Sequence, residues 1–276
     1  MIGDAALHTL RAAPTPTPRA PEPPMTSFIH DGIEIAYIDE GPRDGAPILL
    51  IHGFASNYKT NWVDTIWVRF LTRNGRRVIA MDNRGHGGSS KLYNVEDYGS
   101  PLMAEDARRL LDHLGIPRAD VMGYSMGARI TAFLALAHPE RVRSAIFAGM
   151  GINMVRGLAG TGPIAHALEA DSIDDVTNPT ARTFRAFAEQ THADLKALAA
   201  CIRSARAVIS AEMLATLQVP VLVAVGTEDV IGGSATQLAA IIPGAKALEI
   251  PGRDHMRAVG DRVFKEGEEA FLKERG

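Results

Sequence analysis

From residue 25 to the end of the chain, two hydrophobic patterns alternate. Short, almost wholly apolar runs are typical of strands buried on both faces, and they lie at 47–53, 76–82, 119–125, 142–150, 219–226 and 245–250. Between them, apolar side chains recur at helical spacing over 60–72, 101–114, 126–140, 234–242 and 256–273. Short strands that alternate with helices predict an α/β fold, with a mostly parallel central sheet covered by helices on both faces.

Two segments depart from this alternation. Residues 28–41 predict two short strands around an Asp31-Gly32 turn, and therefore a hairpin that adds an antiparallel edge to the sheet. Residues 152–211 have helix-favouring patches and no convincing buried strand. We therefore expect a small helical cap, inserted into the sequence of the sheet domain and lying over one edge of the sheet.

The first 24 residues have a different composition. Six of the sixteen prolines lie within residues 14–24, a composition typical of extended, polyproline-like chain without a face to bury. We expect a disordered tail; a proline-motif ligand is the functional alternative, and Met25 is an alternative native start. The predicted organisation is a tail at 1–24, a first core part at 25–151, the cap at 152–211, and a second core part at 212–276.

Composition narrows the class of protein. The chain has 276 residues, 46% apolar and 22% charged, with 29 basic against 32 acidic side chains, so an obligate nucleic-acid or anionic-membrane partner is not indicated. The single cysteine, Cys201, excludes an internal disulfide; it falls within the predicted cap, away from every catalytic motif. The sequence shows neither a signal-peptide pattern nor a bilayer-spanning apolar run, so a cytoplasmic location is expected.

The sharpest local signal is Gly123-Tyr124-Ser125-Met126-Gly127, which matches G-x-S-x-G between a predicted strand and a predicted apolar helix. A nucleophile on so tight a strand-to-helix turn adopts a strained backbone, and the crowded positions on either side require glycine. The amides at the start of the following helix favour developing negative charge. Ser125 is therefore the predicted nucleophile.

A serine hydroxyl needs a base, and the base needs a group that orients it. His255 lies in the loop after the last predicted strand, and Asp229 directly follows the strand at 219–226. Both positions come after the carboxyl ends of strands, where sites in parallel sheets gather. We predict Ser125, His255 and Asp229 as nucleophile, base and orienting acid.

On the basis of these residues, we note that the chain resembles the α/β-hydrolase family over roughly residues 28–276. The order Ser125, Asp229, His255 is that of the family. The resemblance extends to His52-Gly53-Phe54 and to the glycine-rich loop at 82–87. It implies an oxyanion hole formed by the backbone amides of Phe54 and Met126.

Several residues compete for these roles. Asp254 is an alternative acid but adjoins His255, and His52 and His86 are alternative bases, for which the resemblance implies hydrogen bonding within their loops. Asp82 is expected to cap its loop rather than to bind metal. The sequence contains no metal-ligand spacing and no phosphate-binding fingerprint, so no metal and no cofactor are predicted.

The predicted function is hydrolysis of carboxylic esters of small to medium, mainly neutral substrates through an acyl-enzyme, with water as the second reactant. A lactonase, a carbon–carbon bond hydrolase and a cofactor-free perhydrolase on the same triad remain alternatives. The resemblance places an aspartate at the nucleophile position of dehalogenases and epoxide hydrolases, and Ser125 argues against both. A ligand-binding receptor or pseudoenzyme on the same fold is the alternative from another class. The oligomeric state is left open.

Overall fold

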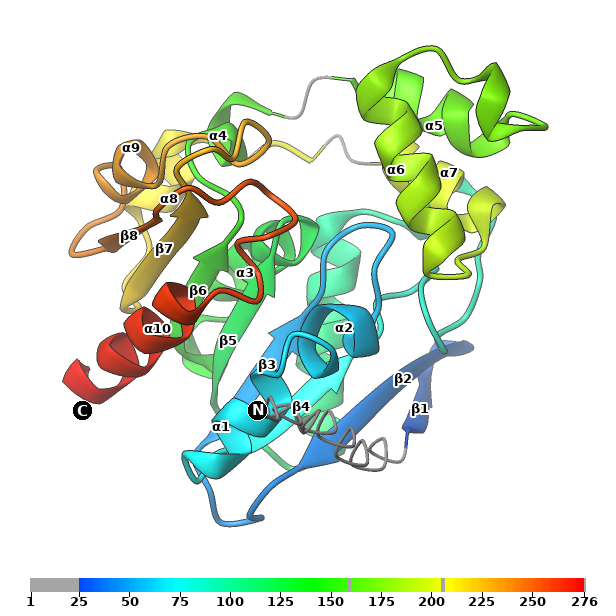
Figure 1. Cartoon of the computed structure of the whole chain (residues 1–276). Coiled ribbons are helices and arrows are strands. Elements are labelled where there is room, and N and C mark those ends of the chain that lie inside the picture. Colours follow the sequence, from blue (N-terminus) through cyan, green and yellow to red (C-terminus); the bar gives the residue numbers. More distant parts are fainter. Residues whose placement is uncertain (1–24, 158–159, 205–206, 276) are drawn as a thin grey trace, which may run out of the picture.

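A computed structural model describes residues 25–157, 160–204 and 207–275, so the predicted tail at 1–24 lies outside the described residues. The centre of the fold is an eight-stranded sheet of order β1-β2-β4-β3-β5-β6-β7-β8 (Figure 1). Its strands are β1 Thr26–His30, β2 Ile33–Glu40, β3 Pro47–Ile51, β4 Arg77–Met81, β5 Ala119–Tyr124, β6 Val142–Ala148, β7 Val221–Gly226 and β8 Lys246–Ile250. The predicted α/β class is confirmed.

The sheet is parallel except at one edge, where the predicted hairpin lies. From β4 to β8 neighbouring strands are parallel, with β3 paired to β4 on one side and to β5 on the other. β1 and β2 form the antiparallel edge, confirming the predicted hairpin, and β2 pairs antiparallel with β4. Asp31 and Gly32 both have positive φ, 48° and 78°, as a two-residue hairpin turn of this hand requires.

Helices cover both faces of the sheet, and each face has its own apolar core. One face is covered by α1 (Trp67–Arg73) and α10 (Arg262–Glu274) (Figure 1). The other carries α2 (Ser100–His113), α3 (Met126–Ala137) and α9 (Ala235–Ala239). α3 packs directly on β5 and β6, so the chain after Ser125 is held against the middle of the sheet.

Two of the predicted helices differ from the structure. The helix expected over 60–72 is interrupted: a π-helical turn at Lys59–Val63 is separated from α1 by Ile66, whose φ is 70°. The helix expected over 256–273 begins only at Arg262, because the Asp261 carboxylate accepts a hydrogen bond from the Val263 amide and caps the helix there. The residues that precede Asp261 are thereby left as a loop that carries His255.

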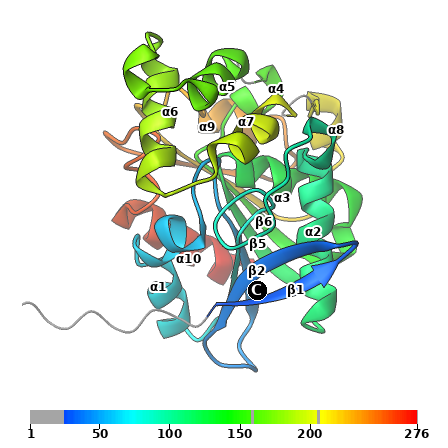
Figure 2. The same ribbon diagram turned by 90° about the vertical axis from the view of Figure 1, so that its right-hand side faces the viewer.

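The remaining helices lie between β6 and β7 along the chain. They are α4 Asn153–Arg156, α5 Thr161–Glu169, α6 Pro179–Gln190, α7 Leu195–Arg203 and α8 Ala211–Ala215. α5 packs against both α6 and α7, and these three helices form a group beyond the carboxyl ends of the parallel strands, at the top of Figure 2. None of the helices in the described ranges is long and apolar enough to cross a bilayer.

Candidate active site

Ser125 sits on a strained turn between β5 and α3. Its backbone has φ 55° and ψ −111°, a conformation that costs a non-glycine residue free energy and persists only where the surroundings fix it. The Ser125 amide donates to the Ala148 carbonyl at 2.8 Å, which ties the turn to β6. This conformation agrees with the strained backbone predicted from the G-x-S-x-G pattern.

The glycines at 123 and 127 are required by close backbone approach. A Cβ at Gly123 would lie 2.0 Å from the Gly127 carbonyl oxygen, and a Cβ at Gly127 would lie 2.0 Å from that of Ile51. Both obstacles are backbone atoms, which cannot rotate out of the way. The turn therefore forms only with glycine at both positions.

The structure brings the three residues predicted as nucleophile, base and acid into one hydrogen-bonded line. His255 Nε2 lies 3.0 Å from the Ser125 Oγ, and His255 Nδ1 lies 2.8 Å from the Asp229 Oδ2. Asp229 and His255 are buried, and the serine is partly exposed. With its Nδ1 proton directed to the carboxylate, the imidazole presents a free lone pair to the serine hydroxyl.

Backbone amides fix the carboxylate of Asp229. Its Oδ1 accepts from the Ile231 amide at 2.9 Å and from the Gly232 amide at 2.7 Å, which leaves Oδ2 for the imidazole. Both donors are backbone amides, whose positions are fixed by the loop that follows Asp229. Asp229 is thus held in one orientation before substrate binds.

Tyr124 has a role that was not predicted from the sequence. Its hydroxyl donates to the His255 carbonyl at 2.6 Å, and burial raises the pKa of this phenol well above its usual range. The hydroxyl therefore stays protonated and holds the loop of the histidine against β5. A polar aromatic side chain directly before the nucleophile, at the end of a buried strand, was the available signal.

The two residues predicted to supply oxyanion-hole amides lie beside the serine. Phe54 and Met126 line the same cavity as Ser125. Met126 is the first residue of α3, where amides have no partner within the helix. The loop of Phe54 is positioned by Asn61, whose side-chain oxygen accepts from the Gly53 amide at 3.1 Å; Asn61 was not singled out from sequence.

The alternative acid and bases have other partners. The Asp254 Oδ1 accepts from the amides of Met256 and Arg257, at the start of a turn. His52 is fully buried, burial lowers its pKa to about 4, and its Nε2 accepts from the Asn83 amide at 3.0 Å. His86 is equally buried, with its pKa lowered to about 3, first by desolvation and then by the charge of His52.

Asp82 has two backbone partners of its own. It accepts hydrogen bonds from the amides of Tyr58 and Gly88, both at 2.7 Å, and burial raises its pKa. It therefore fixes two loops, as the capping interpretation predicts.

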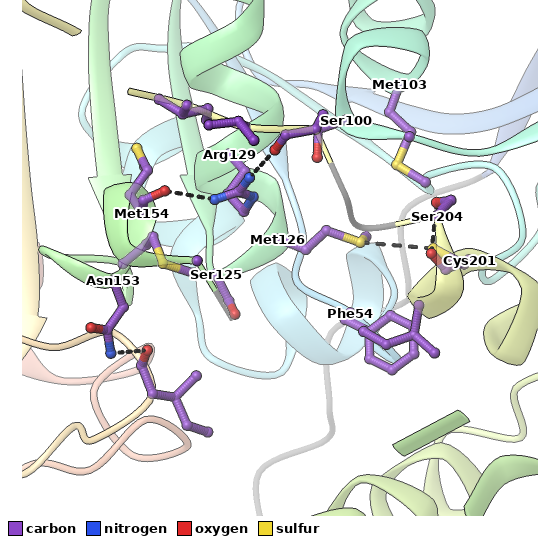
Figure 3. Close-up of a pocket in the computed structure, with 18 of the residues that line it drawn as sticks. Phe54, Ser100, Met103, Ser125, Met126, Arg129, Asn153, Met154, Cys201 and Ser204 are labelled. Atoms are coloured by element: carbon purple, nitrogen blue, oxygen red, sulfur yellow. Dashed lines mark hydrogen bonds between the residues drawn. The ribbon is translucent and has the colours of Figure 1, made fainter. Parts of the chain in front are cut away.

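Two cavities meet at Ser125, and both are also lined by Phe54, Phe184 and Ile231. The first, here called the arginine-side cavity, has a volume of about 400 Å³ and contains Met126 and Arg129 (Figure 3). The second, the histidine-side cavity, has a volume of about 330 Å³ and contains His255. Each is large enough for part of a small organic molecule.

The prediction that Cys201 lies away from every catalytic motif is wrong. α7 brings its thiol to 4.0 Å from the thioether sulfur of Met126, and the residue lines the arginine-side cavity (Figure 3). Sequence distance conceals this approach because the helices after β6 fold back over the site. Burial raises the pKa of the Cys201 thiol to about 12, so it remains a thiol and acts as an apolar wall.

The comparison with protein families agrees with this architecture. A family model described as "alpha/beta hydrolase fold" matches residues 46–157, the stretch from β3 past the serine turn. The chain has the α/β-hydrolase fold. This confirms the fold that the resemblance in the sequence implies.

Individual relatives cover several activities. The chain is 33% identical over 134 residues to "Bifunctional epoxide hydrolase 2" of Rattus norvegicus. The aligned stretch covers 48% of this chain and 23% of that protein. It is 32% identical over 110 residues to "Bifunctional esterase/perhydrolase DCH" of Acinetobacter calcoaceticus, covering 40% of this chain and 38% of that protein. The chain thus spans well under half the length of these curated relatives.

Among solved structures, the enol-lactonase from Burkholderia xenovorans LB400 superposes with a TM-score of 0.76. The two sequences are 22% identical, and the match covers 90% of this chain and 100% of the other. At this identity, the likeness concerns the fold.

Proposed function

We propose that the protein hydrolyses carboxylic esters through an acyl-enzyme formed on Ser125, with His255 as general base and acid and Asp229 as its orienting carboxylate. The single observation that carries this proposal is the unbroken line of hydrogen bonds from Ser125 through His255 to Asp229 on a strained turn. The substrate is a small organic ester, and the second reactant is water.

In the first half-reaction, the Ser125 Oγ attacks the ester carbonyl while its proton passes to His255 Nε2. The carbonyl oxygen becomes an oxyanion and accepts hydrogen bonds from the amides of Phe54 and Met126, each of which lowers the barrier by roughly 3 kcal/mol. The bond between the carbonyl carbon and the alcohol oxygen then breaks, and His255 gives its proton to the departing alcohol.

The second half-reaction releases the acid. His255 takes a proton from water, the resulting hydroxide attacks the acyl carbon, and the Ser125–acyl bond breaks as the proton returns to the serine. Asp229 keeps the imidazole in the required tautomer and stabilises its cation in both halves. No group other than these side chains and amides is needed for the proton transfers.

Two further points support acyl transfer. The name of the Acinetobacter calcoaceticus relative includes esterase activity, and the serine turn of this chain falls within the family match. The nucleophile position holds a serine, whereas the resemblance places aspartate there in the epoxide-opening branch. A serine nucleophile with a histidine base is suited to acyl transfer.

The test is hydrolysis of ethyl butanoate and longer ethyl esters. The acid released is measured as the amount of alkali needed to keep the pH constant. We expect Ser125→Ala to lose at least about a thousandfold in kcat while keeping its melting temperature within a few degrees. Ser27→Ala, which changes a serine on the antiparallel edge, is the matched control and should keep full activity. A lactone and a peracid-forming assay run in parallel distinguish the alternatives, and ester hydrolysis surviving in Ser125→Ala would refute the proposal.

A further inference from the structure

The two cavities beside Ser125 differ in charge. Charged side chains of one sign only, those of Arg129 and Arg156, line the arginine-side cavity, and no carboxylate lines it within the described residues. Apart from the imidazole of His255, the side chains around the histidine-side cavity are neutral or apolar. One side of the nucleophile is therefore positive and the other is neutral.

Arg129 differs from three other arginines whose side chains are buried or partly buried. Arg84 pairs with Asp106, Arg77 with Asp39, and Arg185 with Glu189. Arg129 donates instead to two backbone carbonyls, Met154 at 2.8 Å and Ala207 at 2.6 Å, and forms no ion pair with any described residue.

A guanidinium has more donors than these two bonds use, so Arg129 keeps hydrogen-bonding capacity as well as uncompensated charge. Burial alone lowers its pKa, with no carboxylate acting in the opposite direction. The pKa of a guanidinium lies so high that the group still carries its proton at neutral pH.

The position of Arg129 in α3 is costly for a structural residue. It is the fourth residue of the helix, near the positive end of the helix dipole, where cations are disfavoured. It is also the only charged residue in the twelve-residue apolar segment of α3. The charge therefore adds to the positive end of the helix, as a site for an anion would.

The positions of His255 and of the oxyanion-hole amides decide which part of the substrate each cavity holds. His255 must protonate the departing alcohol oxygen, so the alcohol occupies the histidine-side cavity. Because the acyl carbon is bonded to Ser125 and its oxygen faces the amides of Phe54 and Met126, the acyl chain extends into the arginine-side cavity.

We infer that the substrate is an ester of a neutral alcohol with an acyl chain that itself ends in a carboxylate, and that Arg129 binds this carboxylate. The inference rests on the proposed function and narrows it. The small net charge of the whole chain predicts mainly neutral substrates, whereas the charge lining this cavity favours an anionic one. Water cleaves the ester bond of such a substrate and gives a dicarboxylate, the free alcohol and a proton.

The experiment compares two substrates that differ only in this charge. Monoethyl adipate carries a carboxylate at the end of its acyl chain at neutral pH, and ethyl 5-carbamoylpentanoate carries an uncharged amide of the same shape there. Released ethanol is measured for both. We expect the native sequence to prefer monoethyl adipate by about tenfold or more in kcat/KM, the usual range for a charge-assisted hydrogen bond.

Arg129→Gln should remove this preference, mainly by raising KM for monoethyl adipate, and should change the rate on the amide by less than about threefold. Arg129→Lys, which retains the charge, should restore part of the preference. The matched control is Arg118→Gln: Arg118 is exposed, donates to the Val142 carbonyl, and should leave both substrates unaffected.

Two outcomes would overturn the inference: equal hydrolysis of both esters by the native sequence, or a parallel loss on both esters in Arg129→Gln, which would show a purely structural role. The failure of the proposed function looks different. In that case neither these esters nor ethyl butanoate would be hydrolysed, whereas a failure of the inference alone leaves Ser125-dependent hydrolysis without charge preference.

Discussion

Replacing Asp229 by asparagine tests its proposed role as the carboxylate that orients His255. The Asp229 Oδ1 accepts from two backbone amides, those of Ile231 and Gly232. Asparagine must keep its carbonyl oxygen on these donors, since the opposite orientation would set its NH2 group against two N–H groups. The NH2 group therefore faces His255 Nδ1, which must become an acceptor and lose its proton.

The consequence falls on the other ring nitrogen. With Nδ1 unprotonated, the neutral imidazole carries its proton on Nε2, 3.0 Å from the Ser125 Oγ, where the lone pair is needed. The histidine can then no longer accept the serine proton. In serine proteases, an aspartate-to-asparagine change that imposes the wrong tautomer costs roughly 10⁴ in kcat, which corresponds to about 5.5 kcal/mol in activation free energy.

The assay is kcat on ethyl butanoate at neutral pH, together with the melting temperature. Asp254→Asn is the control: the Asp254 Oδ1 accepts from the amides of Met256 and Arg257, and the asparagine carbonyl can do the same. The Oδ2 makes only a 3.8 Å ion pair with the exposed Arg257. We expect Asp229→Asn to lose about 10³ to 10⁴ in kcat and Asp254→Asn to stay within about threefold. Comparable losses in the two variants, or less than a tenfold loss in Asp229→Asn, would refute the assignment of the acid.

Two further predictions concern stability. Gly127→Ala should fail to keep the serine turn, with a lower melting temperature and lost esterase activity, because its Cβ would lie 2.0 Å from the Ile51 carbonyl oxygen; an active variant of native stability would contradict this. Glu268 is buried on α10, and desolvation raises its pKa from 4.5 to about 8, so the native state binds its proton more tightly than the unfolded chain and stability falls as pH rises from about 4.5 to 8. Glu268→Gln should therefore melt close to the native sequence at pH 5 and several degrees higher at pH 8, and a melting difference independent of pH would contradict this.

Much of the sheet was predictable because its information is local. The apolar runs that form β3 to β7 have to be buried on both faces, and the glycines at 123 and 127 identify the turn that needs them. The broken helix at Ile66 was not predictable, because a left-handed residue other than glycine has no sequence signature. Its surroundings come from tertiary packing: Trp67 contacts Phe264 of α10, and Trp62 contacts Trp67. The late start of α10 depended on which of several acidic residues caps it.

The candidates Ser125, Asp229 and His255 followed from the sequence, because each comes after a strand whose end had to reach the same edge of a parallel sheet. How these three side chains are held depends on long-range contacts that the sequence does not reveal.

The Tyr124 hydroxyl makes such a contact with the His255 carbonyl, 131 residues away. The tertiary fold also brings Cys201 and Arg129 into one cavity with the serine. Tyr124 and Cys201 each meet a group that is distant in sequence, and the hydrophobic pattern shows which residues are buried but not which buried residues are in contact.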